Sequence, residues 1–243
     1  MPKDHIFLSD VHIQKIDEEN HLSLISFLDS IKKTTHSLYI LGDLFDFWYG
    51  YRSVVYYEYI PILNKFLELK NAGINLYFLE GNHEFRFDLF FGNVLKANVN
   101  PRYLNIDINN KKFFLAHGDS IDTIDLGHKV LNFFIKNPLV YMVVGLSHPG
   151  FWWKIAGIVS KFSRNRLDNG NQKLIEAYER FAEKKFSEGS DVIILGHSHD
   201  PKIQNKNING REKVLVYLGD WLTERSYVKY DGTSFELCNF NKL

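Results

Sequence analysis

Five short polar segments, each directly after an apolar run, constrain this chain more than any other feature. Short apolar runs bounded by turn residues predict buried β-strands. The runs are Ile6–Ser9, Leu38–Leu41, Leu76–Leu79, Phe113–Ala116 and Val192–Leu195. The polar segments that follow them are Asp10-Val11-His12, Gly42-Asp43, Gly81-Asn82-His83-Glu84, His117-Gly118-Asp119 and Gly196-His197-Ser198-His199. Because aspartate, asparagine and histidine side chains suit divalent cations, we predict a metal site at the ends of several strands.

Helical patterns lie between these strands. Apolar residues recur at helical spacing in Glu18–Lys33 and in the amphipathic segment Gln172–Glu188. Tyr56–Asn71 is a third predicted helix, interrupted early by Pro61. Short strands are expected in the last third of the chain, at Lys213–Leu218, Ser226–Tyr230 and Ser234–Phe240, with a turn at Asp231-Gly232. The alternation of strands and helices predicts a layered α/β fold.

Length and composition limit the class of protein. The 243 residues suffice for one large domain with a sizeable core. With 29 basic and 29 acidic residues the formal net charge is zero, so we expect no nucleic-acid partner. A single cysteine, Cys238, excludes an intrachain disulfide and fits a reducing compartment. The first residues run into the first strand without a signal peptide pattern, so we expect a cytoplasmic protein.

The segment Ile121–Asn169 breaks the alternation. It contains two apolar blocks and lies between the fourth and fifth polar segments in the sequence. We therefore expect a helical cap, inserted over about residues 121–169 into a single domain that spans residues 1–243. Its apolar side chains either line a substrate pocket or pack against the sheet, and the sequence leaves both readings open. The aromatic ones are Phe133, Phe134, Phe151, Trp152 and Trp153.

The order D-x-H, G-D, G-N-H-E, H-G-D, G-H-x-H resembles the calcineurin-like metallophosphoesterase superfamily over nearly the whole chain. Longer segments at Gly42–Trp48, His117–Ser120 and Gly219–Glu224 are similar to the UDP-2,3-diacylglucosamine pyrophosphohydrolases of lipid A synthesis. The resemblance implies a layered α/β/β/α sandwich with a helical cap insertion. It also implies a metal-dependent hydrolase of phosphoesters or pyrophosphates.

By the same resemblance the cofactors are two divalent metal ions, with manganese as our choice and iron, zinc or cobalt as alternatives. Asp43 takes the position that bridges the two ions. Asp10, His12 and His199 complete the first set of ligands, and Asn82, His117 and His197 complete the second. Two such ions deprotonate a bridging water and neutralise the charge of the phosphoryl oxygens.

His83 is the predicted catalytic residue. In the superfamily this histidine protonates or stabilises the leaving oxygen, whereas we expect Gly-Asn-Arg-Asp at this place in the lipid A enzymes. Arg86 is either a substitute for the missing positive charge or an ordinary surface arginine. The resemblance further implies substrate contacts by Trp48, Asp125, Arg164 and Arg166. Arginine suits phosphate because it bonds two oxygens at once, although the last two residues also fit a solvated helix end.

Three functions remain open at this level. The first is a pyrophosphohydrolase that cleaves the lipid-linked UDP-sugar UDP-2,3-diacylglucosamine to UMP and 2,3-diacylglucosamine 1-phosphate, as a peripheral protein at the inner-membrane surface. The second is a metallophosphatase or phosphodiesterase acting on a soluble nucleotide or other phosphoester. The third is a non-catalytic scaffold, which has no need of seven intact ligands. The aromatic cap favours the first function, and His83 keeps the second open.

Overall fold

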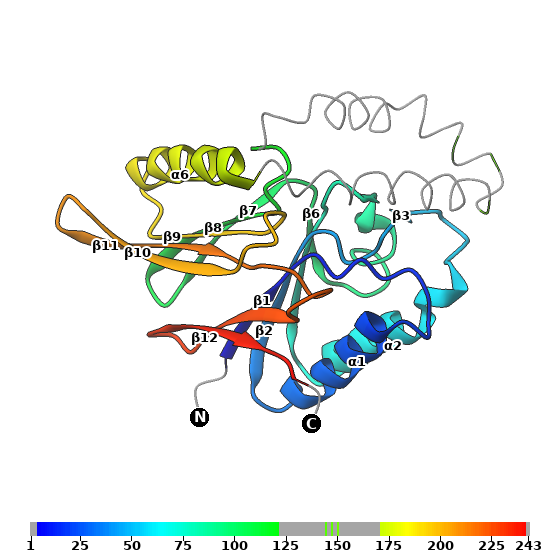
Figure 1. Ribbon diagram of the computed structural model, residues 1–243. Helices are drawn as coiled ribbons and strands as arrows, with labels where there is room; N and C mark the ends of the chain where they lie inside the picture. The colour runs from blue at the N-terminus through cyan, green and yellow to red at the C-terminus, as the bar shows by residue number, and fades with distance from the viewer. Residues whose placement is uncertain (1–3, 122–143, 145–146, 148–149, 151–170, 242–243) are drawn as a thin grey trace.

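The computed structural model describes residues 4–121, 144, 147, 150 and 171–241. Two stacked β-sheets carry helices on their outer faces (Figure 1). The strand order is β13-β12-β1-β2-β4-β6 in one sheet and β10-β11-β9-β8-β7 in the other. This α/β/β/α layering confirms the predicted fold class. The predicted cap insertion lies almost entirely outside the described residues, so the single-domain arrangement with a cap stays a prediction.

The six-stranded sheet contains the first three predicted strands side by side and parallel. Antiparallel strands extend it beyond β1, and a short parallel strand extends it beyond β4. Its members are β1 (Asp4–Leu8), β2 (Thr35–Leu41), β4 (Asn75–Leu79), β6 (Asn98–Asn100), β12 (Ser226–Tyr230) and β13 (Phe235–Asn239). The turn between the last two strands lies at Asp231 and Gly232, as predicted, and Asp231 accepts the backbone N–H groups of the next turn residues.

The five-stranded sheet contains the other two strands that precede polar segments. These two strands, β8 and β9, are parallel neighbours, and β11 continues the parallel set. Antiparallel β7 and β10 form the edges. The bounds are β7 (Tyr103–Ile108), β8 (Lys111–Ala116), β9 (Val192–Leu195), β10 (Lys202–Ile208) and β11 (Arg211–Tyr217).

Helices cover the two outer faces. α1 (Glu19–Ile31) and α2 (Ile60–Asn71) pack on the six-stranded sheet, and α6 (Asn171–Ser187) packs on the five-stranded sheet (Figure 1). The predicted interruption by Pro61 is wrong. Pro61 lies in the first turn of α2, where its missing N–H has no helical partner to lose, so it does not interrupt the helix that begins at Ile60. No helix within residues 4–121 and 171–241 is long and apolar enough to cross a membrane.

Alternating side chains on the central strands divide the core into three apolar layers. On β1, Ile6 and Leu8 face α1 and α2, whereas Phe7 faces the second sheet. On β8, Phe113 faces the first sheet and Phe114 packs toward α6. Strands buried on both faces need apolar residues at every position, which explains the uninterrupted apolar runs in the sequence.

The parallel strands of both sheets end at the same edge of the sandwich. The end of β1 meets the end of β9, where the backbone N–H of His197 donates to Asp10 at 2.9 Å. The end of β2 meets the end of β8, where Nδ1 of His117 lies 2.9 Å from the Leu41 carbonyl. The carboxyl ends of parallel strands are where open α/β sheets bind ligands. The fold therefore brings the polar segments together.

Candidate metal centre

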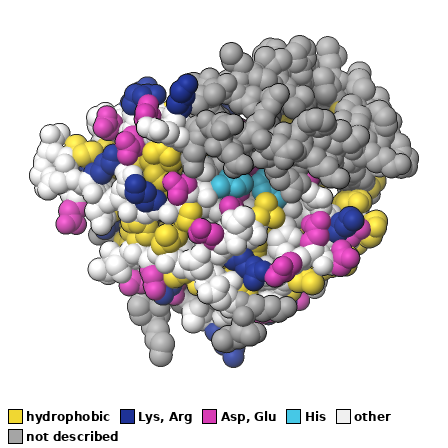
Figure 2. All heavy atoms as spheres, in the orientation of Figure 1, with side chains coloured by type: hydrophobic (Ala, Val, Ile, Leu, Met, Phe, Trp, Pro, Cys, Tyr) yellow, Lys and Arg dark blue, Asp and Glu magenta, His cyan; other side chains and the backbone are white. Residues whose placement is uncertain are grey.

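All seven predicted ligand residues and His83 lie together at this edge. Their ligand atoms form overlapping groups whose members lie within 4.8 Å of one another. These groups are Asp10, Asp43, His117 and His197; Asp10, His12 and His199; and His12, Asp43 and His83. Oδ1 of Asn82 joins them at 3.1 Å from Nε2 of His117. Figure 2 shows histidine side chains at the surface of this face, next to acidic ones.

Asp43 lies between the two predicted sets of ligands. Its Oδ2 atom is 3.8 Å from Nε2 of His12, which belongs to one set. The same atom is 3.4 Å from Nε2 of His117, which belongs to the other. A carboxylate that serves two ions must reach both sets, and the position of Asp43 meets this requirement.

Polar contacts at the ring nitrogen that points away from the ligand group orient the imidazoles. Nδ1 of His117 donates to the Leu41 carbonyl, which leaves Nε2 toward Asn82 and Asp43. Nδ1 of His199 lies 3.4 Å from Oδ2 of Asp220, and its Nε2 lies 3.4 Å from Oδ1 of Asp10. Such outer partners select the tautomer and ring orientation of metal-binding histidines.

Five of the predicted ligands have a left-handed backbone conformation. Residues other than glycine rarely adopt it, although Asp and His tolerate it better than most, and each sparsely populated conformation costs about 1–3 kcal/mol. The φ angles are 56° for Asp10, 52° for His12, 52° for Asp43, 65° for His197 and 54° for His199. The surrounding fold imposes this geometry, and such strain concentrates at functional sites.

The donor set fits divalent metal ions. Burial opposes the charge of Asp43, but His117 and His83 hold its pKa well below the ordinary value. Burial also opposes a proton on His199, yet the neighbouring carboxylates of Asp10 and Asp220 outweigh burial and raise its pKa to about 10. Oδ1 of Asp10 is buried and has no hydrogen-bond partner among the described residues. An ionised, unsatisfied carboxylate oxygen in this setting is a ligand for a cation.

Glu84 joins two of the ligand loops, a role that the sequence analysis did not assign. Its buried carboxylate accepts the backbone N–H groups of Asp43 at 2.9 Å, Gly81 at 3.0 Å and Phe45 at 3.0 Å. The loop that follows β2 is thus connected to the loop that follows β4. Gly81 permits this approach, because a Cβ atom there would lie 2.1 Å from Oδ1 of Asp43. The sequence feature that could have indicated this role is the position of Glu84 in G-N-H-E, two residues after the predicted ligand Asn82.

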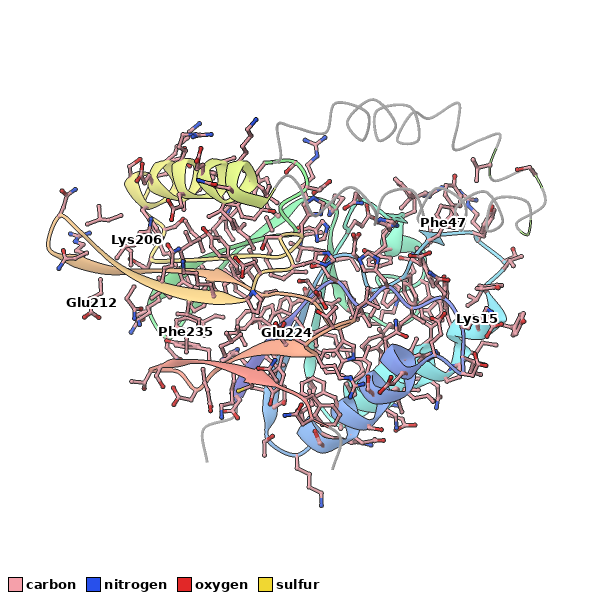
Figure 3. The ribbon with its side chains drawn as sticks, in the orientation of Figure 1. Lys15, Phe47, Lys206, Glu212, Glu224 and Phe235 are labelled. Carbon is pink, nitrogen blue, oxygen red and sulfur yellow. The ribbon has the colours of Figure 1, made fainter. Side chains whose placement is uncertain are left out.

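Replacing Glu84 with glutamine should weaken metal binding by roughly 10- to 100-fold, the usual cost of losing an outer-shell partner. The amide nitrogen cannot accept an N–H group, so a buried backbone donor loses its partner. Titration of the metal-free protein with manganese measures the change. Glu212→Gln is the matched control, since Glu212 lies on the exposed β10–β11 hairpin, away from the site (Figure 3). Unchanged affinity in Glu84→Gln would contradict this role.

His83 is anchored on one side and faces the ligand group with the other. Its Nδ1 lies 2.8 Å from the Asp46 carbonyl, and because a carbonyl only accepts, Nδ1 carries the hydrogen. Its backbone N–H donates to Oδ1 of Asp43 at 3.1 Å. Nε2 lies 3.9 Å from Oδ2 of Asp43, so it is the nitrogen available to a substrate.

The predicted substrate residues have different outcomes. Trp48 is 4% exposed and packs in the core against Phe45 and Phe91, and its contact with substrate stays a prediction. Arg86 follows β5 (Glu84–Phe85), directly after the ligand loop. The remaining three, Asp125, Arg164 and Arg166, lie outside the described residues, as do the aromatic residues of the predicted cap.

The sequence matches the calcineurin-like phosphoesterase family over residues 6–201. The chain belongs to this family. The superfamily inferred from the motifs is thereby confirmed, and this calcineurin-like phosphoesterase is a metal-dependent phosphoester hydrolase.

The sequences of several known proteins align with this phosphoesterase over nearly its whole length. A UDP-2,3-diacylglucosamine hydrolase from Porphyromonas gingivalis is 27% identical and aligns over 95% of both chains. A protein of the same name from Vibrio atlanticus is 28% identical and aligns over 96% of both chains. Another from Proteus mirabilis is also 28% identical and aligns over 97% of this chain and 98% of its own. The structure of an archaeal phosphodiesterase superposes with a TM-score of 0.52 at 13% identity, over 98% of this chain and 99% of the other, which supports the fold alone.

Proposed function

We propose that the chain is a dinuclear pyrophosphohydrolase that cleaves UDP-2,3-diacylglucosamine to UMP and 2,3-diacylglucosamine 1-phosphate in lipid A synthesis. The observation that carries the proposal is the ligand cluster centred on Asp43, assembled in a chain whose full-length relatives bear the name of this hydrolase. A scaffold would have no need of a complete cluster held in strained backbone conformations.

In this proposal each ion takes three residues of its own and shares Asp43. Asp10, His12 and His199 hold one ion, and Asn82, His117 and His197 hold the other. Two ions held in this way would supply a water molecule of lowered pKa and would neutralise phosphoryl charge. Manganese is our choice by family resemblance. Iron, zinc and cobalt suit the same oxygen and nitrogen ligands, and cellular supply decides among them.

The residues of the chain have separate tasks in the reaction. Asp43 orients both sets of ligands through its central carboxylate. Glu84 keeps the loops that carry Asp43 and Asn82 in register. His83 presents Nε2 to the leaving oxygen, while its Nδ1–H stays on the Asp46 carbonyl. His83 therefore supplies positive charge or a proton where negative charge develops.

A phosphatase or phosphodiesterase acting on a soluble nucleotide or other phosphoester is the second candidate. The observation that favours it is the anchored His83. A sugar 1-phosphate is stable as an anion and leaves without protonation, so it has little need of a histidine. An alkoxide leaves only with a proton, and the imidazolium form of an oriented histidine supplies one from Nε2.

The proposed substrate is a lipid, which assigns the chain to the inner-membrane surface as a peripheral cytoplasmic protein. An exposed apolar group supports contact with lipid. Val54, Tyr57 and Ile60 are 45%, 64% and 56% exposed. Ile16, 44% exposed, adjoins them because its backbone N–H donates to Glu58 at 2.8 Å.

Mass spectrometry of the reaction products tests the proposal. With manganese, UDP-2,3-diacylglucosamine should yield UMP and the lipid sugar 1-phosphate. It should be preferred over UDP-N-acetylglucosamine by orders of magnitude, since each buried methylene contributes about 0.8 kcal/mol. A nitrophenyl phosphodiester serves as a control for an intact metal centre, and flotation with phospholipid vesicles tests membrane contact. Equal rates on both UDP-sugars would contradict the lipid substrate and favour the soluble phosphoester.

A further inference from the structure

We propose that Asn20, in the first turn of α1, is a positioning residue for one ion of the pair, the ion assigned to His12. The inference rests on the two-ion centre of the proposed function and names the helix that holds one half of it. Asn20 is not itself a proposed ligand. It acts through the backbone of the loop that carries Asp10 and His12.

The side chain of Asn20 bonds the ligand loop with both of its hydrogens. Its amide nitrogen donates to the carbonyls of Val11 at 2.8 Å and His12 at 3.2 Å. Its amide oxygen accepts the backbone N–H of His21 at 2.9 Å, which fixes the two ends of the amide because an N–H group can only donate. Asn20 is buried, so water does not replace these bonds easily. The amide is therefore fully used, and its two donors serve the loop after β1.

This loop is held from two sides. The backbone N–H groups of Val11 and His12 donate to the Asp43 carbonyl at 2.9 Å and 3.0 Å, and the carbonyls of the same two residues accept from Asn20. Between these supports His12 has its left-handed φ of 52°. A residue other than glycine keeps such a conformation where its neighbours enforce it. Asn20 supplies the bonds on the α1 side, and the direction of the His12 side chain depends on them.

A second residue of α1 extends the connection to the other ligands of the same ion. The hydroxyl of Ser23 donates to the Asn20 carbonyl at 3.1 Å and accepts the indole N–H of Trp221 at 3.0 Å. The backbone N–H of Trp221 donates to the Asp10 carbonyl at 3.1 Å. The residue before Trp221 contacts the ring of His199. Buried hydrogen bonds thus connect α1 with the loops of all three ligands.

The ligands of the other ion have separate supports. The ring of His117 is bonded to the Leu41 carbonyl. The carbonyl of Gly196, which precedes His197, accepts the hydroxyl of Tyr178 on α6 at 3.2 Å. None of these bonds involves α1. Loss of the Asn20 amide should therefore act on one ion and spare the other.

A purely structural role makes a different prediction. Asparagine is a poor helix former, and here it satisfies one free N–H of the first turn of α1. If that were its whole contribution, its removal would lower the stability of the fold and affect both ions alike. The positioning role leaves two carbonyls of the ligand loop without their donor, and it predicts a selective loss.

Titration of the metal-free protein with manganese, followed by electron paramagnetic resonance, tests the proposal. In Asn20→Leu one ion should bind as in the unaltered protein, and the other should bind roughly 10- to 100-fold more weakly, the usual cost of losing an outer partner of a ligand. At a manganese concentration that fills both sites of the unaltered protein, the variant should show the spectrum of an isolated ion in place of that of a coupled pair. Asn64→Leu is the matched control, since Asn64 is exposed on α2 and donates to Glu68 of its own helix.

Ser23→Ala is a second, milder variant, because it leaves the Asn20 amide in place and removes the link to Trp221. It should weaken the same ion by a smaller factor. Ser30→Ala is its control on the same helix. The hydroxyl of Ser30 donates to the Phe27 carbonyl at 2.7 Å, three residues back as in Ser23, but Ser30 is exposed and away from the ligand loops. Thermal unfolding of the metal-free proteins shows whether each variant is folded.

Two ions bound with unchanged affinity in Asn20→Leu would overturn the assignment. Equal weakening of both ions would also overturn it, because it indicates general damage to the fold. If Asn20→Leu does not fold, the same two outcomes in Ser23→Ala decide the matter. An unaltered protein that binds a single ion would contradict the dinuclear centre of the proposed function. One that binds two ions and leaves UDP-2,3-diacylglucosamine intact would contradict the proposed substrate, and the titration would still decide the role of Asn20.

Discussion

Asp43→Asn is expected to remove metal binding and turnover together. The carboxylate reaches both sets of ligands, with Oδ2 at 3.8 Å from Nε2 of His12 and 3.4 Å from Nε2 of His117. Asparagine retains the shape and tolerates the left-handed backbone at φ 52°, so the substitution removes charge and little else. Bound metal should fall from about two ions per chain. Turnover should fall by at least about 10³-fold, because metal ions contribute several kcal/mol to the transition state.

Elemental analysis of the dialysed protein and a diester assay measure these two losses. Asp107→Asn is the matched control, since Asp107 is exposed on β7 at the edge of the sheet. Circular dichroism should show the same secondary structure in both variants, because the three apolar layers of the core do not involve either residue. An Asp43→Asn protein with two metal ions and near-normal turnover would disprove the bridging assignment.

His83→Arg should separate two classes of substrate. On an anhydride with a good leaving group, arginine still neutralises charge, so substantial activity should remain. On a substrate with an alkoxide leaving group, arginine cannot donate a proton, and the activity should fall about 10²–10⁴-fold. Steady-state rates on UDP-2,3-diacylglucosamine and on an alkyl phosphodiester measure the difference.

His36→Arg is the control for the added charge, because His36 is exposed at the start of β2. It should leave both rates unchanged. Equal losses on the two substrates in His83→Arg would show that His83 acts on the phosphoryl charge or on the geometry of the loop. The anchoring of Nδ1 on the Asp46 carbonyl would then be its main contribution.

The central strands and the ligand cluster could be predicted because one sequence pattern encodes both. A strand buried on two faces must be apolar throughout, and the polar residue at its end marks the edge where it stops. β1, β2, β4, β8 and β9 end within one residue of the apolar runs, and each begins at most three residues before its run. The five polar segments then converge, because parallel strands of both sheets end at one edge.

The edge elements could not be predicted in the same way. β10 has the sequence Lys-Ile-Gln-Asn-Lys-Asn-Ile, which is mostly polar because an edge strand of a solvent-facing hairpin buries little. It is a strand because it pairs along its whole length with β11. β3 (Trp48–Tyr49) and β5 have two residues each and form by pairing with one another. The burial of Trp48 could not be predicted for this reason, since only the register of β3 with β5 shows that it faces the core.

The left-handed backbone conformations of the ligand residues could not be predicted from the sequence either. Local preferences do not indicate that five Asp and His residues adopt positive φ angles. Those angles result from hydrogen bonds between distant loops, such as the bond from His197 to Asp10. The role of Glu84 is of the same kind, because its three backbone partners are brought to it by the fold.

A crystal structure of the manganese-loaded protein, with anomalous data at the manganese edge, tests the dinuclear centre most directly. We predict two anomalous peaks about 3.5–4 Å apart, with an oxygen of Asp43 between them. Asp10, His12 and His199 should contact one peak, and Asn82, His117 and His197 should contact the other. A single peak, or two peaks that Asp43 does not bridge, would contradict the account.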